Sequence, residues 1–271
     1  MIKNERWFHS PSTVSVARAI GKVTFSEVIR DKILYNVILC AFVLFFMGFF
    51  ASRLNFLHPE RIVLDFGLLT VNLSCSMIAI LIGAGLIPKE FERRTIYVAL
   101  SRPISKQQFV FGKFVGLMLV LVLNWCLQCL SYLVLLSLSS ETLVSGFSWT
   151  LTWALFFVLI QSMMLGCIAI LFSTFTTTSL SIVFTLGFYL IGNSISQLRL
   201  LGTRLQSGMG RAVMEGAAAV LPNFEHFNLG YKVTYGLPLE RSLVGLSTLY
   251  GFFVIALCLA LAGLLIRRRE I

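Results

Sequence analysis

The sequence predicts an all-α integral membrane protein with six transmembrane helices. Hydrophobic residues make up 57% of the 271 positions and charged residues only 13%. The apolar residues gather in uncharged blocks of about twenty, the length that an α-helix needs to cross a bilayer. The basic residues lie between these blocks or near their ends. The six expected spans are Ile33–Phe50, Phe66–Ile87, Phe109–Leu136, Leu151–Phe172, Ser179–Ile195 and Leu243–Ile266.

The positions of the basic residues predict which side of the membrane each segment faces. A net charge of +10 would suggest nucleic-acid binding in a soluble protein, but here most of the 22 lysines and arginines flank apolar blocks. We therefore expect membrane lipids and no nucleic acid as partners. The run Arg267–Arg269 marks the cytoplasmic side, and an even number of spans places both termini there. The expected location is the cell (inner) membrane.

The chain divides into two regions where the first apolar block begins. Residues 1–32 are polar and basic, and we interpret them as a cytoplasmic N-terminal interface segment, helical from Val14 onward. They contain no short apolar stretch typical of a signal peptide. Residues 33–271 are expected to form the six-helix transmembrane domain.

Only one long charged segment lies between two apolar blocks, and it spans residues 88–109. Glu90 and Arg94 are spaced i,i+4 with the acid first, an order that stabilises a helix. Pro103 then interrupts any helix, and Ser105 with Gln108 matches a capping box at the start of the third span. The pattern predicts a compact, cytoplasmic polar elbow between the second and third spans.

Residues 196–242 are too many for a plain connector before the last span. Apolar residues in this loop recur at three- or four-residue steps, which predicts an apolar helical face. They are Leu198, Leu201, Leu205, Met209, Val213, Ala217 and Val220. We expect an extracytoplasmic amphipathic helix that breaks at Pro222. Two roles remain open for this helix: it caps a transport pathway, or it is a small external helix with no transport role.

The chemistry that the sequence lacks excludes several function classes. No ionisable residue lies in the interior of an expected span, away from its ends, which argues against a proton- or ion-coupled transporter. The three histidines, His9, His58 and His226, fall in loops, and no serine elbow, aspartate pair or metal motif accompanies them. The sequence has no P-loop motif. We therefore expect no enzyme activity and no cofactor in this chain, so any ATP must be hydrolysed by a partner.

Amide side chains within the spans have two interpretations. Asn124 and Gln128 are spaced i,i+4 and share a face of the third span, and Gln161 lies in the fourth. Such groups commonly form hydrogen bonds between membrane helices. Lining a translocation pathway is the alternative role. The pair Gly112 and Gly116 allows another helix to approach the third span closely.

The elbow resembles the first cytoplasmic loop of ABC-2 type transporter permeases. The shared pattern is an acidic and basic cluster, Thr-Ile, then Leu-Ser-Arg-Pro-Ile-Ser-Lys, and finally Gly-Lys at the third span. It comprises Glu90, Glu92, Arg93, Arg94, Thr95, Ile96, Leu100–Lys106, Gly112 and Lys113. Arg94 departs from it, since many relatives have glycine there. Further similarity occurs at Thr24–Lys32, Leu221–Leu229 and Arg267–Glu270.

The resemblance implies the membrane subunit of an ATP-driven ABC exporter that functions as a dimer. Its expected partners are separate cytoplasmic ABC ATPase subunits and a second copy of itself or a homologous permease. It implies that the elbow transmits the movement of the ATPases. The implied coupling residues are Glu90, Glu92, Arg93, Arg94, Thr95, Arg102, Pro103 and Ser105. The alternatives are a membrane scaffold or assembly factor of the same fold and an uncoupled channel or carrier.

Overall fold

The computed structural model describes residues 13–54, 59–92, 105–138, 149–204, 211–212, 214–216, 218 and 221–268. All regular elements in these residues are helices. In chain order they are α1 (Thr13–Ile29), α2 (Lys32–Leu54), α3 (Pro59–Gly85), α4 (Pro88–Glu92), α6 (Lys106–Leu138), α8 (Trp149–Ser173), α9 (Thr178–Gly192), α10 (Ile195–Arg204), the 3₁₀ helix η1 (Glu225–Phe227), α12 (Gly230–Thr234) and α13 (Arg241–Arg268).

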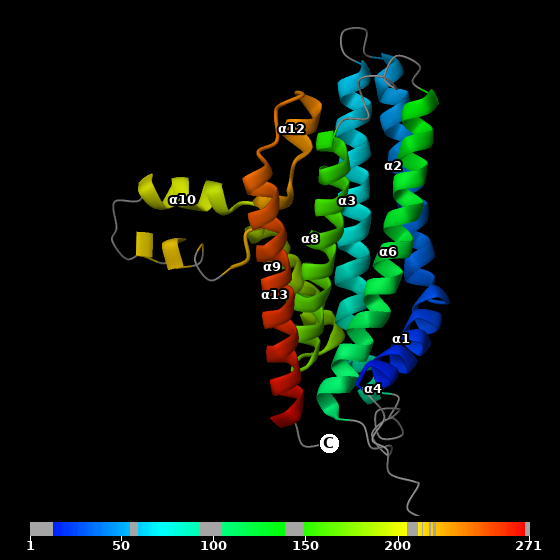
Figure 1. The fold of residues 1–271 in the computed structure, drawn as a ribbon, viewed down its shortest axis with the longest axis vertical. Helices are drawn as coiled ribbons and strands as arrows, with labels where there is room; N and C mark the ends of the chain where they lie inside the picture. The colour runs from blue at the N-terminus through cyan, green and yellow to red at the C-terminus, as the bar shows by residue number, and fades with distance from the viewer. Residues whose placement is uncertain are drawn as a thin grey trace, which may run out of the picture.

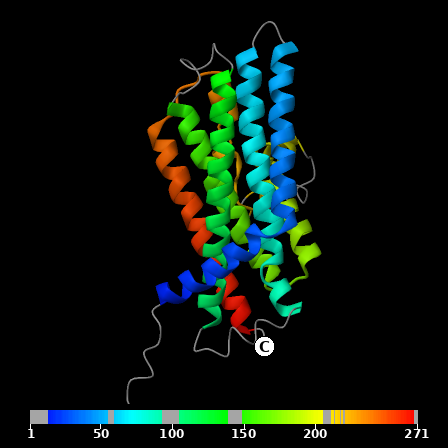
Figure 2. The same cartoon turned by 90° about the vertical axis from the view of Figure 1, so that its right-hand side faces the viewer.

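Five long helices, α2, α3, α6, α8 and α13, form an elongated bundle whose long axis they follow (Figure 1). Each is long and apolar enough to cross a membrane. Helix α1 lies across the bundle at one end, beside α4, and α12 lies at the other end (Figures 1 and 2). We call these the α4 end and the α12 end.

The centre of the bundle is formed by α3 and α8. In the most apolar stretch of each helix, 78% of the α8 residues and 67% of the α3 residues are buried, against 22% for α2. Large apolar side chains on α2 and α13, such as Phe46 and Phe253, are exposed. An apolar surface of this extent is stable when lipid or another membrane subunit covers it.

The fifth expected span differs from the sequence prediction. It corresponds to α9, whose 15 residues extend about 22 Å, less than the roughly 30 Å of a hydrocarbon core. The chain then bends by 66° into α10, so the structure has six spans only if this bent pair counts as one. Figure 1 shows α10 leaving the bundle sideways.

The bend between α9 and α10 lies where a segment from later in the chain packs onto the end of α9. The returning segment packs against Gly192, where an added Cβ would lie 2.4 Å from the Phe224 ring and 2.7 Å from the Pro222 carbonyl oxygen. Asn193 donates to the Tyr189 carbonyl at 2.9 Å, a side-chain bond that competes with helix continuation. Part of the expected amphipathic helix, including Leu205, Met209 and Val213, lies outside the described residues.

Candidate functional site

Five charged side chains from α1, the α1–α2 corner, α4 and α6 meet at the α4 end of the bundle. We call them the charge cluster; they are Glu27, Asp31, Lys89, Glu90 and Lys113. The cluster joins the N-terminal helix to the first turn after the second span and to the start of the third. It therefore connects the segments that a partner on this face would contact.

Lys113 and Glu90 form the most buried ion pair of this cluster. Lys113 Nζ lies 2.5 Å from Glu90 Oε1 and 3.8 Å from Glu27 Oε2, and the exposed fractions of the Lys113 and Glu90 side chains are 4% and 17%. A buried ammonium is costly unless a carboxylate pairs with it. The pair therefore fixes α4 against α6 in one arrangement.

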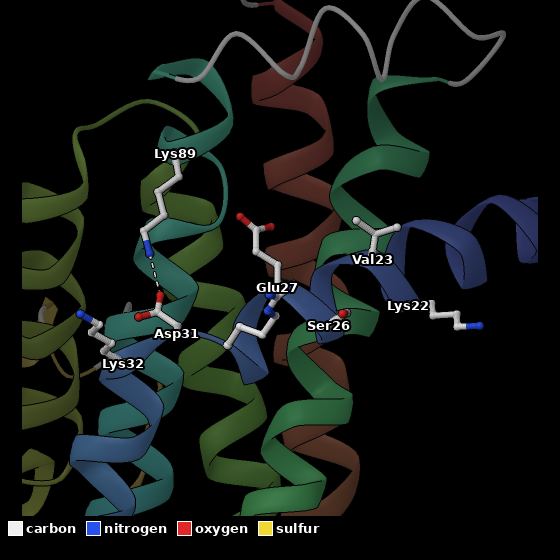
Figure 3. Close-up of a pocket in the computed structure, with 8 residues that line it drawn as sticks. Lys22, Val23, Ser26, Glu27, Asp31, Lys32 and Lys89 are labelled. Atoms are coloured by element: carbon white, nitrogen blue, oxygen red, sulfur yellow. Dashed lines mark hydrogen bonds and ion pairs between the residues drawn. The ribbon is translucent and has the colours of Figure 1, made fainter.

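A second ion pair fixes the other side of α4. Lys89 Nζ lies 2.9 Å from Asp31 Oδ2, and Figure 3 shows the lysine reaching toward the α1–α2 corner. The other oxygen of Asp31 accepts a hydrogen bond from the Ile33 backbone N–H at 3.1 Å, so Asp31 also caps the start of α2. A displacement of α4 would thus act on α2 and α6 together.

An open groove of about 920 Å³ adjoins the charge cluster. Its lining adds three basic residues, Lys22, Arg30 and Lys32, to Glu27, Asp31 and Lys89 of the cluster. Figure 3 shows Lys22 and Lys32 on opposite sides of this groove. The groove is net positive, since four basic groups face two carboxylates.

Glycines allow α1 to pack directly onto α6. A Cβ added at Gly112 would lie 2.7 Å from Ile20 Cβ, and one at Gly116 would lie 2.5 Å from Thr24 Cβ and 2.9 Å from the Gly21 carbonyl oxygen. The predicted close approach is confirmed, and the approaching helix is α1. This contact holds the N-terminal helix beside the charge cluster.

The predicted intramembrane amides form hydrogen bonds between helices. Asn124 donates to Cys75 Sγ at 3.4 Å, and Gln128 donates to Ser74 Oγ at 3.2 Å, which ties α6 to α3. Gln161 on α8 accepts from Asn72 Nδ2 at 3.4 Å. Asn124, Gln128 and Gln161 are all buried. The first two face α3 rather than an open cavity.

Asn72, another amide side chain within the second expected span, is the centre of a second polar cluster. Its Oδ1 accepts from Ser76 at 3.2 Å and from Tyr189 at 3.3 Å, in addition to the bond with Gln161. Together Asn72, Ser76, Gln161 and Tyr189 join α3, α8 and α9. Asn72 and Tyr189 also line a cavity of about 560 Å³ that opens toward the α12 end.

Of the eight predicted coupling residues, the structure describes Glu90, Glu92 and Ser105. The capping box is present, because Gln108 N–H donates to Ser105 Oγ at 3.2 Å and Ser105 N–H donates to Gln108 Oε1 at 3.0 Å. Glu90 faces Lys113, whereas Glu92 at the end of α4 is exposed. Arg93, Arg94, Thr95, Arg102 and Pro103 lie outside the described residues.

Sequence reasoning missed the partners of Glu90 in this cluster. Lys113, Glu27 and Asp31 enter the sequence prediction only as members of the family pattern, with no pairing between them. A signal did exist: Glu27 and Asp31 are spaced i,i+4 and come directly before the first span. Carboxylates at such a position are unexpected next to so many basic residues, which indicates specific pairing.

The sequence model of the ABC-2 family transporter proteins matches residues 18–262. This chain belongs to the ABC-2 family. The match begins within α1 and ends within α13, so it includes the charge cluster and the polar cluster around Asn72. No curated protein matches the chain.

Proposed function

We propose that this chain is the permease subunit of an ATP-driven ABC-2 exporter and that its charge cluster transmits the movement of partner ATPases. The observation that carries the proposal is the buried Lys113–Glu90 pair, held at 2.5 Å between α6 and α4. A short helix that is fixed by ion pairs on both sides moves as a unit with the helices it joins. The family membership and the multi-pass helical fold support the transport role.

The positive groove and the exposed end of α4 supply the docking surface in this proposal. Lys22, Arg30 and Lys32 offer positive charge, while Glu92 is an exposed acid one turn from the cluster. The ATPase subunits dock there, on the cytoplasmic side. Arg93, Arg94, Thr95, Arg102 and Pro103 also take part in coupling in this proposal, and both termini are cytoplasmic.

Permeases of this kind need a second transmembrane subunit to enclose a pathway. The exposed apolar faces of α2 and α13 are available for a second copy of the chain or for a homologous permease. Residues 33–271 form the transmembrane domain in this proposal, and residues 1–32 its interface segment. Gln161 belongs to the pathway through its bond with Asn72, whereas Asn124 and Gln128 stabilise the α3–α6 contact.

The proposal is tested by purifying the affinity-tagged chain from native membranes in mild detergent. We expect a protein with a P-loop and no membrane span to co-purify in a fixed ratio, and the complex to hydrolyse ATP. Tagged chain from cells treated identically but lacking that ATPase is the control. A chain that purifies intact without ATP hydrolysis under conditions that preserve membrane complexes would favour the scaffold or channel alternatives.

A further inference from the structure

The cavity beside Asn72 contains a charged group that the proposed function does not use. It is lined by α3, α8, α9 and the segment that returns from α10, and its volume is about 560 Å³. Most of its wall is apolar, formed by residues such as Leu68, Leu73 and Val158. Asp65 lies at the α12 end of this wall. Asp65 and Asn72 are seven residues apart on α3, so they share a face and lie about 10 Å apart along the helix.

The Asp65 carboxylate has no partner among the residues that the structure describes. Arg61, one turn earlier on α3, forms no ion pair with Asp65 and places its guanidinium 5.4 Å from the centre of the Tyr235 ring. Asp65 is exposed at the mouth of this cavity, so its carboxylate is accessible to a cation that enters from that end.

A second cavity of about 510 Å³ continues from the first at the same residue. Asp65, Asn228 and Gly230 line both cavities, and Glu225, Tyr231 and Tyr235 line the second. Glu225 is fixed by neutral donors, since it accepts hydrogen bonds from the backbone and the hydroxyl of Ser196. The described linings of the two cavities contain two carboxylates and no lysine, arginine or histidine.

The polar groups that line the first cavity include acceptors for a ligand. Asn72 already donates to Gln161, and Asn193 already donates to the Tyr189 carbonyl, which leaves the Asn193 carbonyl oxygen available. Tyr231 and Tyr235 form an aromatic pair with ring centres 4.6 Å apart near the Asp65 end. Since the Arg61 guanidinium already lies over the Tyr235 ring, the attraction for a further cation comes from the carboxylates.

We infer that this cavity binds a cationic amphiphile, with the cationic group at Asp65 and the apolar body between Leu68, Leu73 and Val158. The inference names the substrate class of the proposed exporter and therefore rests on that function for transport. Binding itself needs only this chain. An anion of the same shape is excluded by the two carboxylates, and a fully apolar molecule leaves Asp65 without a counter-charge.

The test compares two probes of nearly the same shape and opposite charge, tetraphenylphosphonium and tetraphenylborate. The purified full chain is placed in nanodiscs of zwitterionic lipid, and binding is measured by equilibrium dialysis with empty nanodiscs subtracted. We expect saturable binding of the phosphonium only. Asp65→Asn should weaken it by about threefold to fivefold, because Asp65 is exposed and an ion pair in contact with water contributes no more than that. Asp65→Glu should retain it.

Two matched variants separate the cavity from other surfaces. Glu240→Gln removes an exposed carboxylate just before α13 that lines neither cavity, and it should leave binding unchanged. Leu73→Trp fills the apolar part of the cavity and should abolish binding. Equal binding of both probes to the wild type, or an unchanged affinity in Asp65→Asn, would overturn the inference. Because no ATPase takes part, that result is independent of the co-purification result that tests the proposed function.

Discussion

At the scale of single residues, the Glu90–Lys113 pair differs from the solvent-facing docking charge that the sequence suggests for Glu90. Surface ion pairs contribute about 0–1 kcal/mol, whereas breaking a buried pair costs about 3–5 kcal/mol because a charge stays buried without its partner. The exposed fraction of Lys113, 4%, places this pair near the second case, although Glu27 at 3.8 Å supplies part of the counter-charge.

We therefore expect Glu90→Gln to destabilise the chain by about 3 kcal/mol. The free energy of unfolding, measured by titration with a denaturing detergent, checks this value. Glu240→Gln is the control, because Glu240 is exposed. The double variant with Lys113→Met should be no less stable than Glu90→Gln alone, since it removes both members of the pair. If Glu90→Gln lowers the free energy of unfolding no more than Glu240→Gln does, the ion pair contributes nothing to stability.

The amides on α6 lead to a second prediction at this scale. Each inter-helix hydrogen bond of this kind contributes about 0.6 kcal/mol on average. Replacing Asn124 and Gln128 together with leucine should therefore lower stability only slightly and leave transport nearly intact. Asn72→Leu should have a larger effect, since Asn72 bonds to three side chains on α3, α8 and α9. A large loss of transport in the α6 double variant at normal abundance would instead assign both amides to the pathway.

At the scale of elements, the glycine contact between α1 and α6 determines where the N-terminal helix lies. Gly116→Ala would place a methyl group 2.5 Å from Thr24 Cβ and 2.9 Å from a backbone oxygen, which cannot move aside easily. We expect α1 to detach, with faster proteolysis near residue 22 and weaker ATPase binding. Gly187→Ala on α9 is the control, because an added Cβ there meets no atom within 4 Å. Equal rates of proteolysis in the two variants would contradict the claim that this contact holds α1 against α6.

The sequence predicted the long helices well because apolar length alone specifies a membrane span. Ser105 and Gln108 also predicted the start of α6, since a capping box is a local signal. The bend after Gly192 was not predictable in the same way, because it depends on Phe224, a residue distant in the sequence. The pairing of Lys113 with Glu90 likewise depends on tertiary structure, and so does the approach of α1 to the two glycines.

At the scale of the whole molecule, topology is the next prediction. With both ends cytoplasmic, Arg268→Cys in a cysteine-free background should be shielded from an impermeant thiol reagent in intact cells. Glu215→Cys, in the segment before the last span, should react. Permeabilised cells provide the control, in which both cysteines should react. Reaction of the cysteine at position 268 in intact cells would overturn the proposed orientation.

The central claim is that the charge cluster links a partner ATPase to the membrane helices. The most direct measurement is ATP hydrolysis retained by the tagged chain after purification, for wild type, for Glu90→Lys with Glu92→Lys, and for the control Glu240→Lys. The double reversal should keep membrane insertion, since acids contribute little to orientation, but place like charge beside the buried Lys113. We predict loss of hydrolysis in the double reversal alone. Full ATPase retention and full hydrolysis in that variant would contradict the account.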